Sequence, residues 1–230
     1  PNLMKINNCK NVKIVGINAL DAAARVLRLD KCIGLEINHV RIHSDAFWNN
    51  DGIDLEDCQN VRITNCNVNA ADDGICLKSN DPNSFCNEIY IADNIIRSSA
   101  SAIKFGTASA GGFKNVTIEN IKIYDTFRSA LAFEAVDGGT IENISASNIT
   151  ATNTGNAIFI KLGHRNIEGK IGTVKNITIK NMVVDIPFGA PDVNYTIRGP
   201  ELPFFHNPFP ASISGLSGHN IENVTLENIE

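Results

Sequence analysis

Short stretches in which apolar and polar residues alternate recur along the chain, and asparagine, aspartate, glycine and serine separate them. Alternation with a period of two is typical of β-strands, and helical periodicity is absent. One phrase, x-Asn-Val-x-Ile-x-Asn, is repeated many times. Its strong copies have their first asparagine at Asn11, Asn60, Asn115, Asn176 and Asn223, and weaker copies begin at Gly34, Glu88 and Asn143. The pattern predicts an all-β protein built from repeats.

A marker residue two places before each copy gives the length of the repeat. The markers are Cys9, Cys32, Cys58, Cys86, Phe113, Ile141, Val174 and Ile221. Repeats of roughly 20 to 30 residues made of strands and Asn/Gly turns are typical of a right-handed parallel β-helix, in which each coil adds one strand to every stacked sheet. Leucine-rich repeats have a similar length, but this chain lacks their leucine consensus. We therefore predict a single-stranded β-helix of about eight coils that spans residues 1–230 as one domain.

A second strand precedes most markers and defines one face of the predicted solenoid. The aligned segments are residues 51–55, 73–77, 101–105, 129–133 and 156–160, and residues 24–29 are the first member of the series. Their third and fifth positions are apolar and should point inward, so the first position, the fourth position and the residue after the fifth should face solvent. Coils stack about 4.8 Å apart, and equivalent positions in successive coils therefore form columns on this outer face.

Cysteines occupy one of the predicted columns. Four of the six belong to the marker column, whose other members are Phe, Ile and Val. They are therefore predicted to be free, buried thiols, although stacked Cα atoms would be close enough for a disulfide.

The longest interval between markers contains a proline-rich insertion at about residues 187–210, with Arg198 and His206 inside it. Such an insertion in a regular solenoid favours a wall of a binding cleft, with a plain surface excursion as the alternative.

Charge and hydropathy argue against two classes of binding partner, nucleic acids and membranes. The formal net charge is −5, and lysines and arginines are scattered. This distribution gives no basic patch for nucleic acid. No run approaches the ~20 apolar residues of a membrane span, so we expect no membrane partner. The chain begins within a coil and stops inside the repeated phrase, and we expect the terminal coils of a longer protein to be missing.

Three aspartates carry the candidate chemistry. Asp51 and Asp73 fall in the same outer-face column one coil apart, and Asp72 precedes Asp73 at the turn. Mutual repulsion among close carboxylates raises the pKa of at least one, which supplies an acid beside ionised bases. A single aspartate there could simply stabilise a turn. Three together point to a catalytic cluster.

The sequence around this cluster resembles glycoside hydrolase family 28, the polygalacturonases and their relatives. Residues 49–54, Asn-Asn-Asp-Gly-Ile-Asp, are similar to the family's Asn-Thr-Asp-Gly-Ile-Asp, and Asp72-Asp73 is similar to its Asp-Asp-Cys. The stretch from Pro210 to His219 looks like bacterial members. The resemblance covers most of the chain.

The resemblance implies an inverting hydrolase that acts on a pectin-type polysaccharide. Asp72 would protonate the leaving glycosidic oxygen, while Asp51 and Asp73 would activate a water on the opposite face of the sugar. It implies no metal and no cofactor, and it implies a secreted or periplasmic location. We expect a monomer.

Two family motifs are replaced in this chain. Ala100-Ser101-Ala102 stands where the family has Gly-His-Gly, and Ala132-Phe133-Glu134 stands where it has Arg-x-Lys. Glu134 reverses the charge at a position that binds an acidic sugar, so a neutral or mixed polymer is expected. The predicted substrate-binding residues are Asn49, Lys78, Lys104, Glu134, Lys161, Arg198 and His206.

Further candidates and two other function classes remain open. Trp48 could stack on a sugar, and Arg25 and Arg128 could border a groove. A lyase or epimerase on the same solenoid would use a basic residue to remove a proton, often with calcium bound by carboxylates. A carbohydrate-binding β-helix without catalysis is the third hypothesis.

Overall fold

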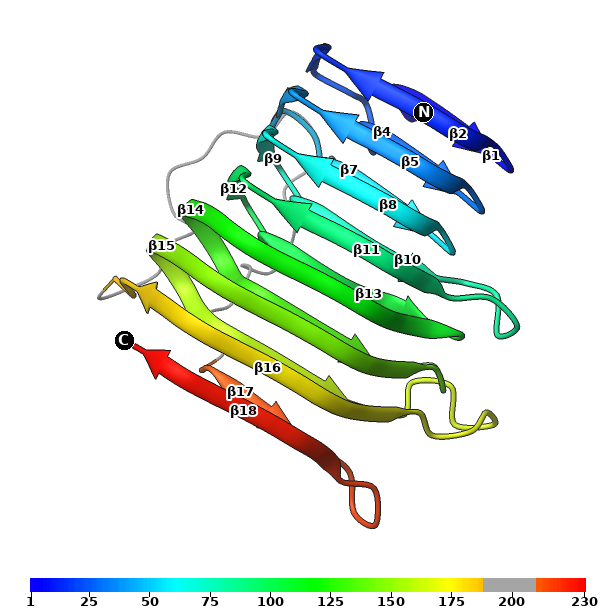
Figure 1. Cartoon of the computed structure of the whole chain (residues 1–230), viewed down its shortest axis with the longest axis vertical. Coiled ribbons are helices and arrows are strands. Elements are labelled where there is room, and N and C mark those ends of the chain that lie inside the picture. The colour runs from blue at the N-terminus through cyan, green and yellow to red at the C-terminus, as the bar shows by residue number, and fades with distance from the viewer. Residues whose placement is uncertain (188–209) are drawn as a thin grey trace.

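The computed structural model describes residues 1–187 and 210–230, and they form a parallel β-helix of stacked coils with the termini at opposite ends (Figure 1). The strands alternate along the chain among three sheet faces. The face that bears the aspartates contains β1 (Met4–Asn7), β4 (Leu27–Asp30), β7 (Ile53–Glu56), β10 (Ile75–Ser79), β13 (Ile103–Ser109) and β17 (Ser212–Ser214).

The other two faces complete each coil. The second face contains β2 (Lys10–Val15), β5 (Ile33–Asn38), β8 (Gln59–Thr64), β11 (Cys86–Ala92), β16 (Thr173–Val184) and β18 (Ile221–Ile229). The third face contains β3 (Asn18–Leu20), β6 (Arg41–Ser44), β9 (Asn67–Ala70) and β12 (Ile95–Ser98). The long strands β14 (Gly112–Ala135) and β15 (Thr140–Leu162) bend around all three faces.

Every pairing between named strands is parallel, and its register follows the predicted columns. Ile53 pairs with Ile75, Ile75 with Ile103 and Ile103 with Leu131. The second face holds eight strands among the described residues, which confirms the predicted number of coils. The aspartate-bearing face begins two coils earlier than residues 51–55, since β1 pairs with β4 and β4 with β7.

The core consists of stacked columns of apolar side chains. Phe105, Phe113 and Phe133 are completely buried, and the Phe105 and Phe133 rings stack with centroids 4.4 Å apart. The six cysteines are free, which includes the four marker-column cysteines for which this was predicted, and all except Cys9, which is only partly buried, are buried. Burial in this way makes the thiols small apolar core residues.

Asparagine ladders hold the corners of the coils. Asn115, Asn143, Asn176 and Asn223 have positive φ, and each side-chain amide donates to the side chain one coil earlier. Asparagine tolerates the left-handed region better than most residues, which explains why the repeated phrase begins with it.

The predicted proline-rich insertion, with Arg198 and His206, lies almost entirely outside the described residues. Within the described ranges, no helix is long and apolar enough to cross a membrane.

Candidate active site

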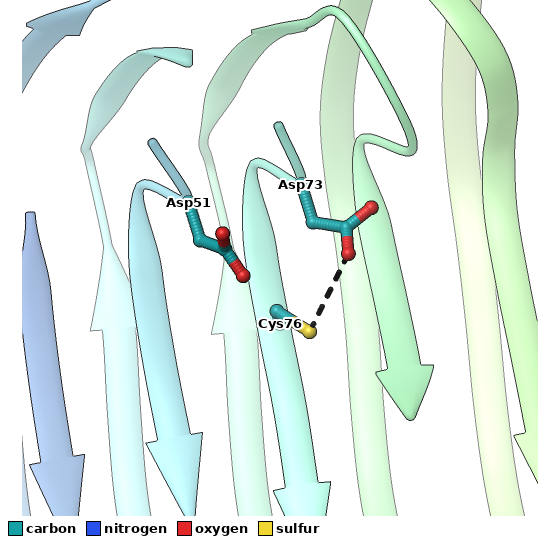
Figure 2. Close-up of side chains that lie close together, drawn as sticks. All are labelled: Asp51, Asp73 and Cys76. Atoms are coloured by element: carbon teal, nitrogen blue, oxygen red, sulfur yellow. Dashed lines mark hydrogen bonds between the residues drawn. The ribbon is translucent and has the colours of Figure 1, made fainter. Parts of the chain in front are cut away.

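Asp51 and Asp73 are stacked neighbours at the start of two adjacent strands of the aspartate-bearing face. The Gly52 N–H donates to the Asp73 carbonyl over 2.9 Å, which fixes the offset of one coil. A carboxyl oxygen of each aspartate and the sulfur of Cys76 lie within 4.8 Å of one another. Figure 2 shows the two carboxylates projecting from adjacent turns, with Cys76 on the following strand β10. The predicted register is therefore present.

The glycine after each of these aspartates lets the coils approach closely. A Cβ on Gly52 would lie 2.5 Å from the Gly74 carbonyl oxygen, and a Cβ on Gly74 would lie 2.6 Å from the Ala102 carbonyl oxygen. Both obstacles are backbone atoms, so a larger residue would push neighbouring coils apart. The Asp-Gly dipeptide thus places a carboxylate where the stack is tightest.

A buried asparagine fixes the turn before Asp51. The Asn50 Oδ1 accepts from Ser44 Oγ (3.0 Å) and from Phe47 N (3.2 Å). Its Nδ2 donates to the carbonyls of Ala22 (2.8 Å) and Ala24 (2.7 Å). Four bonds to a completely buried side chain give the turn one conformation.

Hydrogen bonds also orient Asp72 and Asp73. The Asp73 N–H donates to Asp72 Oδ1 (2.9 Å), and the Ser101 N–H donates to Asp73 Oδ1 (3.2 Å). Ser98 Oγ donates to the Asp72 carbonyl (2.6 Å). Asp73 is buried, whereas Asp72 is only partly buried and borders the groove described below.

Two lysines each pair with one of the stacked aspartates. Lys78 Nζ lies 2.6 Å from Asp51 Oδ2 and 2.6 Å from Asp54 Oδ1, and it donates to Cys76 Sγ over 3.3 Å. Lys104 Nζ lies 3.2 Å from Asp73 Oδ2. Both lysine side chains are about a tenth exposed. The positively charged ammonium of Lys78 therefore lies near the carboxylates of Asp51 and Asp73 and the sulfur of Cys76.

The expectation that the outer-face positions face solvent is wrong for this part of the face. Asp54 and Cys76 occupy the fourth position in their strands and are completely buried, and Glu56, after the fifth position, is 2% exposed. Arg25 Nε lies 2.6 Å from Asp54 Oδ2, and Arg28 forms two hydrogen bonds with Glu56. These side chains point away from the core but cover one another through ion pairs.

The two adjacent aspartates have opposite pKa shifts. Burial, with repulsion from Asp73 and Asp51, raises the pKa of Asp72 to about 7. Burial alone would also raise the pKa of Asp73, but the ammonium groups of Lys104 and Lys78 outweigh it and lower that pKa. The pair therefore presents a protonated acid beside a carboxylate at mildly acidic pH.

The three aspartates line a groove on the outer face. A cavity of about 490 Å³ is bordered by Asp51, Asp72 and Asp73. An adjoining cavity of about 400 Å³ extends over the following coils and shares Lys104, Thr107 and Arg128 with the first. Together they form a groove along the solenoid, large enough for more than one sugar ring.

The structure places the predicted substrate-binding residues in different environments. Asn49 is exposed at the first cavity, and Lys161 is exposed at the second. Glu134 is partly buried, with its carboxylate 3.8 Å from Lys104. Arg198 and His206 lie outside the described residues. The described site residues therefore converge on one groove.

Among the further candidates, Trp48, Arg25 and Arg128 all border the first cavity. Sequence reasoning missed the buried ion pairs of Asp54. Arg25 lies two residues before Leu27, which pairs with Ile53, so an arginine one coil before Asp51 was the available signal.

Comparisons with known proteins point to one family. Residues 1–186 match the model of the family Glycosyl hydrolases family 28. A probable polygalacturonase of Arabidopsis thaliana is 27% identical over 163 residues, which are 70% of this chain and 35% of that protein. Polygalacturonase-2 of Solanum lycopersicum is 22% identical over 193 residues, which are 80% of this chain and 41% of that protein.

Solved structures show the same fold. An exopolygalacturonase from Thermotoga maritima superposes with a TM-score of 0.70 and 24% identity, over 80% of this chain and 44% of that one. A polygalacturonase from Erwinia carotovora superposes with a TM-score of 0.72 and 18% identity, over 100% of this chain and 56% of that one. The fold is thus a right-handed parallel β-helix, and this chain spans about a third to just over half of the length of these relatives. Because the family match extends over residues 1–186, the chain belongs to glycosyl hydrolases family 28.

Proposed function

We propose that the groove hydrolyses glycosidic bonds of a pectin-type polysaccharide with inversion at the anomeric carbon. The observation that supports this best is the raised pKa of Asp72, about 7, directly beside an ion-paired Asp73 in a groove that Asp51 also lines. General acid catalysis works best when the pKa of the acid is near the working pH. A carboxylic acid and separate carboxylates are the groups that this reaction requires.

The proposed reaction uses the protons already on these groups. The Asp72 O–H gives its proton to the glycosidic oxygen as the bond from that oxygen to the anomeric carbon breaks. A water molecule, oriented by Asp51 and Asp73, attacks the same carbon from the opposite face and loses a proton to one of these carboxylates. Exchange with solvent then returns the proton to Asp72.

Charges along the second cavity support binding of a charged or mixed polymer. Lys104, Arg128 and Lys161 line it together with Glu134. The buried Nε of Arg128 has no hydrogen-bond partner, and Arg128 forms no ion pair within the described part of the chain. A sugar carboxylate would satisfy this guanidinium. The charge reversal at Glu134 instead favours a neutral or mixed polymer, so both classes belong in the test.

Other predicted residues take their places around this reaction. Asn49 and Lys161, which are exposed, would contact the sugar directly. Lys78 already has partners for its three N–H groups and would hold Asp51 in place. The resemblance also leads us to propose a secreted or periplasmic location for this protein.

The test is hydrolysis of oligogalacturonates and of rhamnogalacturonan fragments by the wild type, Asp72→Asn and Asp125→Asn. Asp125 is an exposed aspartate that accepts a hydrogen bond from Asn153, and it is the matched control. We expect Asp72→Asn to lower kcat by roughly 100-fold or more, as loss of a general acid does. Asp125→Asn should retain wild-type activity.

Two outcomes would contradict the proposal. If Asp72→Asn hydrolyses the substrate at the wild-type rate, Asp72 is not the general acid. Products that absorb in the near ultraviolet would indicate a lyase, because elimination leaves an unsaturated sugar whereas hydrolysis only adds reducing ends. Tight binding of the oligosaccharides without turnover would favour a carbohydrate-binding role.

A further inference from the structure

Lys104 is a buried lysine that lies between two carboxylates. It belongs to β13, and it pairs in register with Cys76 on one side and Ala132 on the other. Its side chain is 9% exposed, and its ammonium lies 3.2 Å from Asp73 Oδ2 and 3.8 Å from Glu134 Oε1. A lysine is almost never buried to this extent unless it is paired. Its conformation is therefore set by these two acidic residues.

The cations of the site are distributed unequally among the three aspartates. Lys78 pairs with Asp51 and Lys104 pairs with Asp73, whereas Asp72 forms no ion pair among the described residues. The neighbouring backbone does not share this asymmetry, because each of the two adjacent carboxylates accepts one backbone N–H. The Ser101 N–H donates to the Asp73 carboxylate, and the Asp73 N–H supplies one donor to Asp72.

We propose, on the basis of the function proposed above, that Lys104 is a positioning residue that decides which member of the Asp72–Asp73 pair carries the proton. The ammonium stabilises the anion of Asp73. Because two adjacent carboxylates repel each other when both are charged, the proton then stays on Asp72. Glu134 acts through Lys104: its carboxylate keeps the ammonium charged and holds it toward Asp73.

Four elements bring charged or titratable groups to the Asp72–Asp73 pair. They come from the turn before β7, from β10, from β13 and from β14, and they are Asp51, Cys76, Lys78, Lys104 and Glu134. Of these, Lys104 is the cation that contacts Asp73 directly. Attraction by both lysines opposes the raised pKa of Asp72 but does not overcome burial and its two acidic neighbours.

The test compares Lys104→Met, Lys104→Arg and Lys122→Met. Methionine keeps the length of the side chain without its charge, and arginine keeps the charge. Lys122 is an exposed lysine in the part of β14 that pairs with β12 on the third face of the solenoid. We expect Lys104→Met to lower kcat roughly 10- to 100-fold, because fewer molecules hold the proton on Asp72. KM should change much less. The acidic limb of the kcat profile should move up by about one pH unit or more, since an opposite charge at this distance lowers a carboxyl pKa by that amount. Lys104→Arg should retain most of the wild-type kcat and most of the wild-type pH profile.

A second measurement does not depend on turnover. Titration of the Asp73 carboxyl carbon by NMR, in an Asp72→Asn background, should show a higher pKa once Lys104→Met is added, and Lys122→Met should leave it unchanged. An unaltered Asp73 titration, or a raised KM with an unaltered pH profile, would overturn the role of Lys104 even where Asp72→Asn is inactive. If Asp72→Asn hydrolyses at the wild-type rate, the proposed function itself fails, and the two failures are thus distinguishable.

Discussion

At the scale of single residues, the arrangement of charge separates two aspartates that are neighbours in sequence. Repulsion between close carboxylates could be predicted from the sequence, but repulsion alone does not say which carboxylate keeps the proton. In the structure, Lys104 contacts Asp73, whereas burial and two acidic neighbours disfavour the ionised form of Asp72. The side chain that decides the outcome comes from the next coil, so the sequence pattern around Asp72 could not reveal it.

The raised pKa of Asp72 predicts a pH-dependent cost to stability. The ordinary value of 3.8 rises to about 7 in the folded protein. The folded state therefore binds this proton more tightly than the unfolded chain, and the free energy of unfolding should fall as pH rises from about 4 to about 7. Asp72→Asn removes this titration and keeps an oxygen that can accept from the Asp73 N–H.

We expect Asp72→Asn to be more stable than the wild type at pH 8 by about 2 to 4 kcal/mol, since each pKa unit corresponds to about 1.4 kcal/mol. The two proteins should be closely similar near pH 4. Urea unfolding at both pH values, with Asp125→Asn as control, measures this difference. A variant that is no more stable than the wild type at pH 8 would show that folding does not raise the pKa of Asp72.

At the scale of strands and turns, the Asp-Gly dipeptides connect fold and site. A β-carbon on Gly52 would lie 2.5 Å from the Gly74 carbonyl oxygen, a distance that demands movement of a coil. The repeated glycine was visible in the sequence alignment, but the reason for it required the contact with the next coil. Movement there would also shift Asp51 relative to Asp73.

Gly52→Ala should destabilise the protein by about 1 to 3 kcal/mol, as overpacking in a rigid interior does. It should also lower kcat, because the two carboxylates lose their spacing. Gly16→Asn is the matched control, since Gly16 has a φ of +69° and no atom within 4 Å of its ideal Cβ. Chemical unfolding and hydrolysis assays test both variants. Equal stability of Gly52→Ala and the wild type would contradict the close-approach account.

The asparagine turns show which features of the coils could be predicted from the sequence. The repeated asparagines marked the coils in the sequence, and the structure shows the physical cause in their positive φ values and stacked amides. The same repetition places a Ser or Thr two residues after Asn115, Asn143, Asn176 and Asn223, so these Asn-x-Ser/Thr triplets reflect the coil pattern, and their asparagine amides take part in the ladder.

At the scale of the whole molecule, a repeat makes the fold predictable and the surface chemistry much less so. Inward-facing columns follow from period and apolarity, and their register is confirmed strand by strand. Outward-facing residues obey no such rule. Asp54 and Lys104 were placed on the correct face, but their burial depends on ion pairs with Arg25, Lys78 and Glu134 from other coils.

The most direct test of the three-aspartate account is the configuration of the newly formed anomeric centre. Proton NMR of fresh hydrolysate, recorded before mutarotation, identifies the first anomer released from a pectic oligosaccharide. The three-aspartate mechanism predicts the anomer opposite to that of the cleaved bond, at a rate that falls above about pH 7 as Asp72 loses its proton. Release of the retained anomer would contradict it, because that product requires a carboxylate to attack the sugar directly.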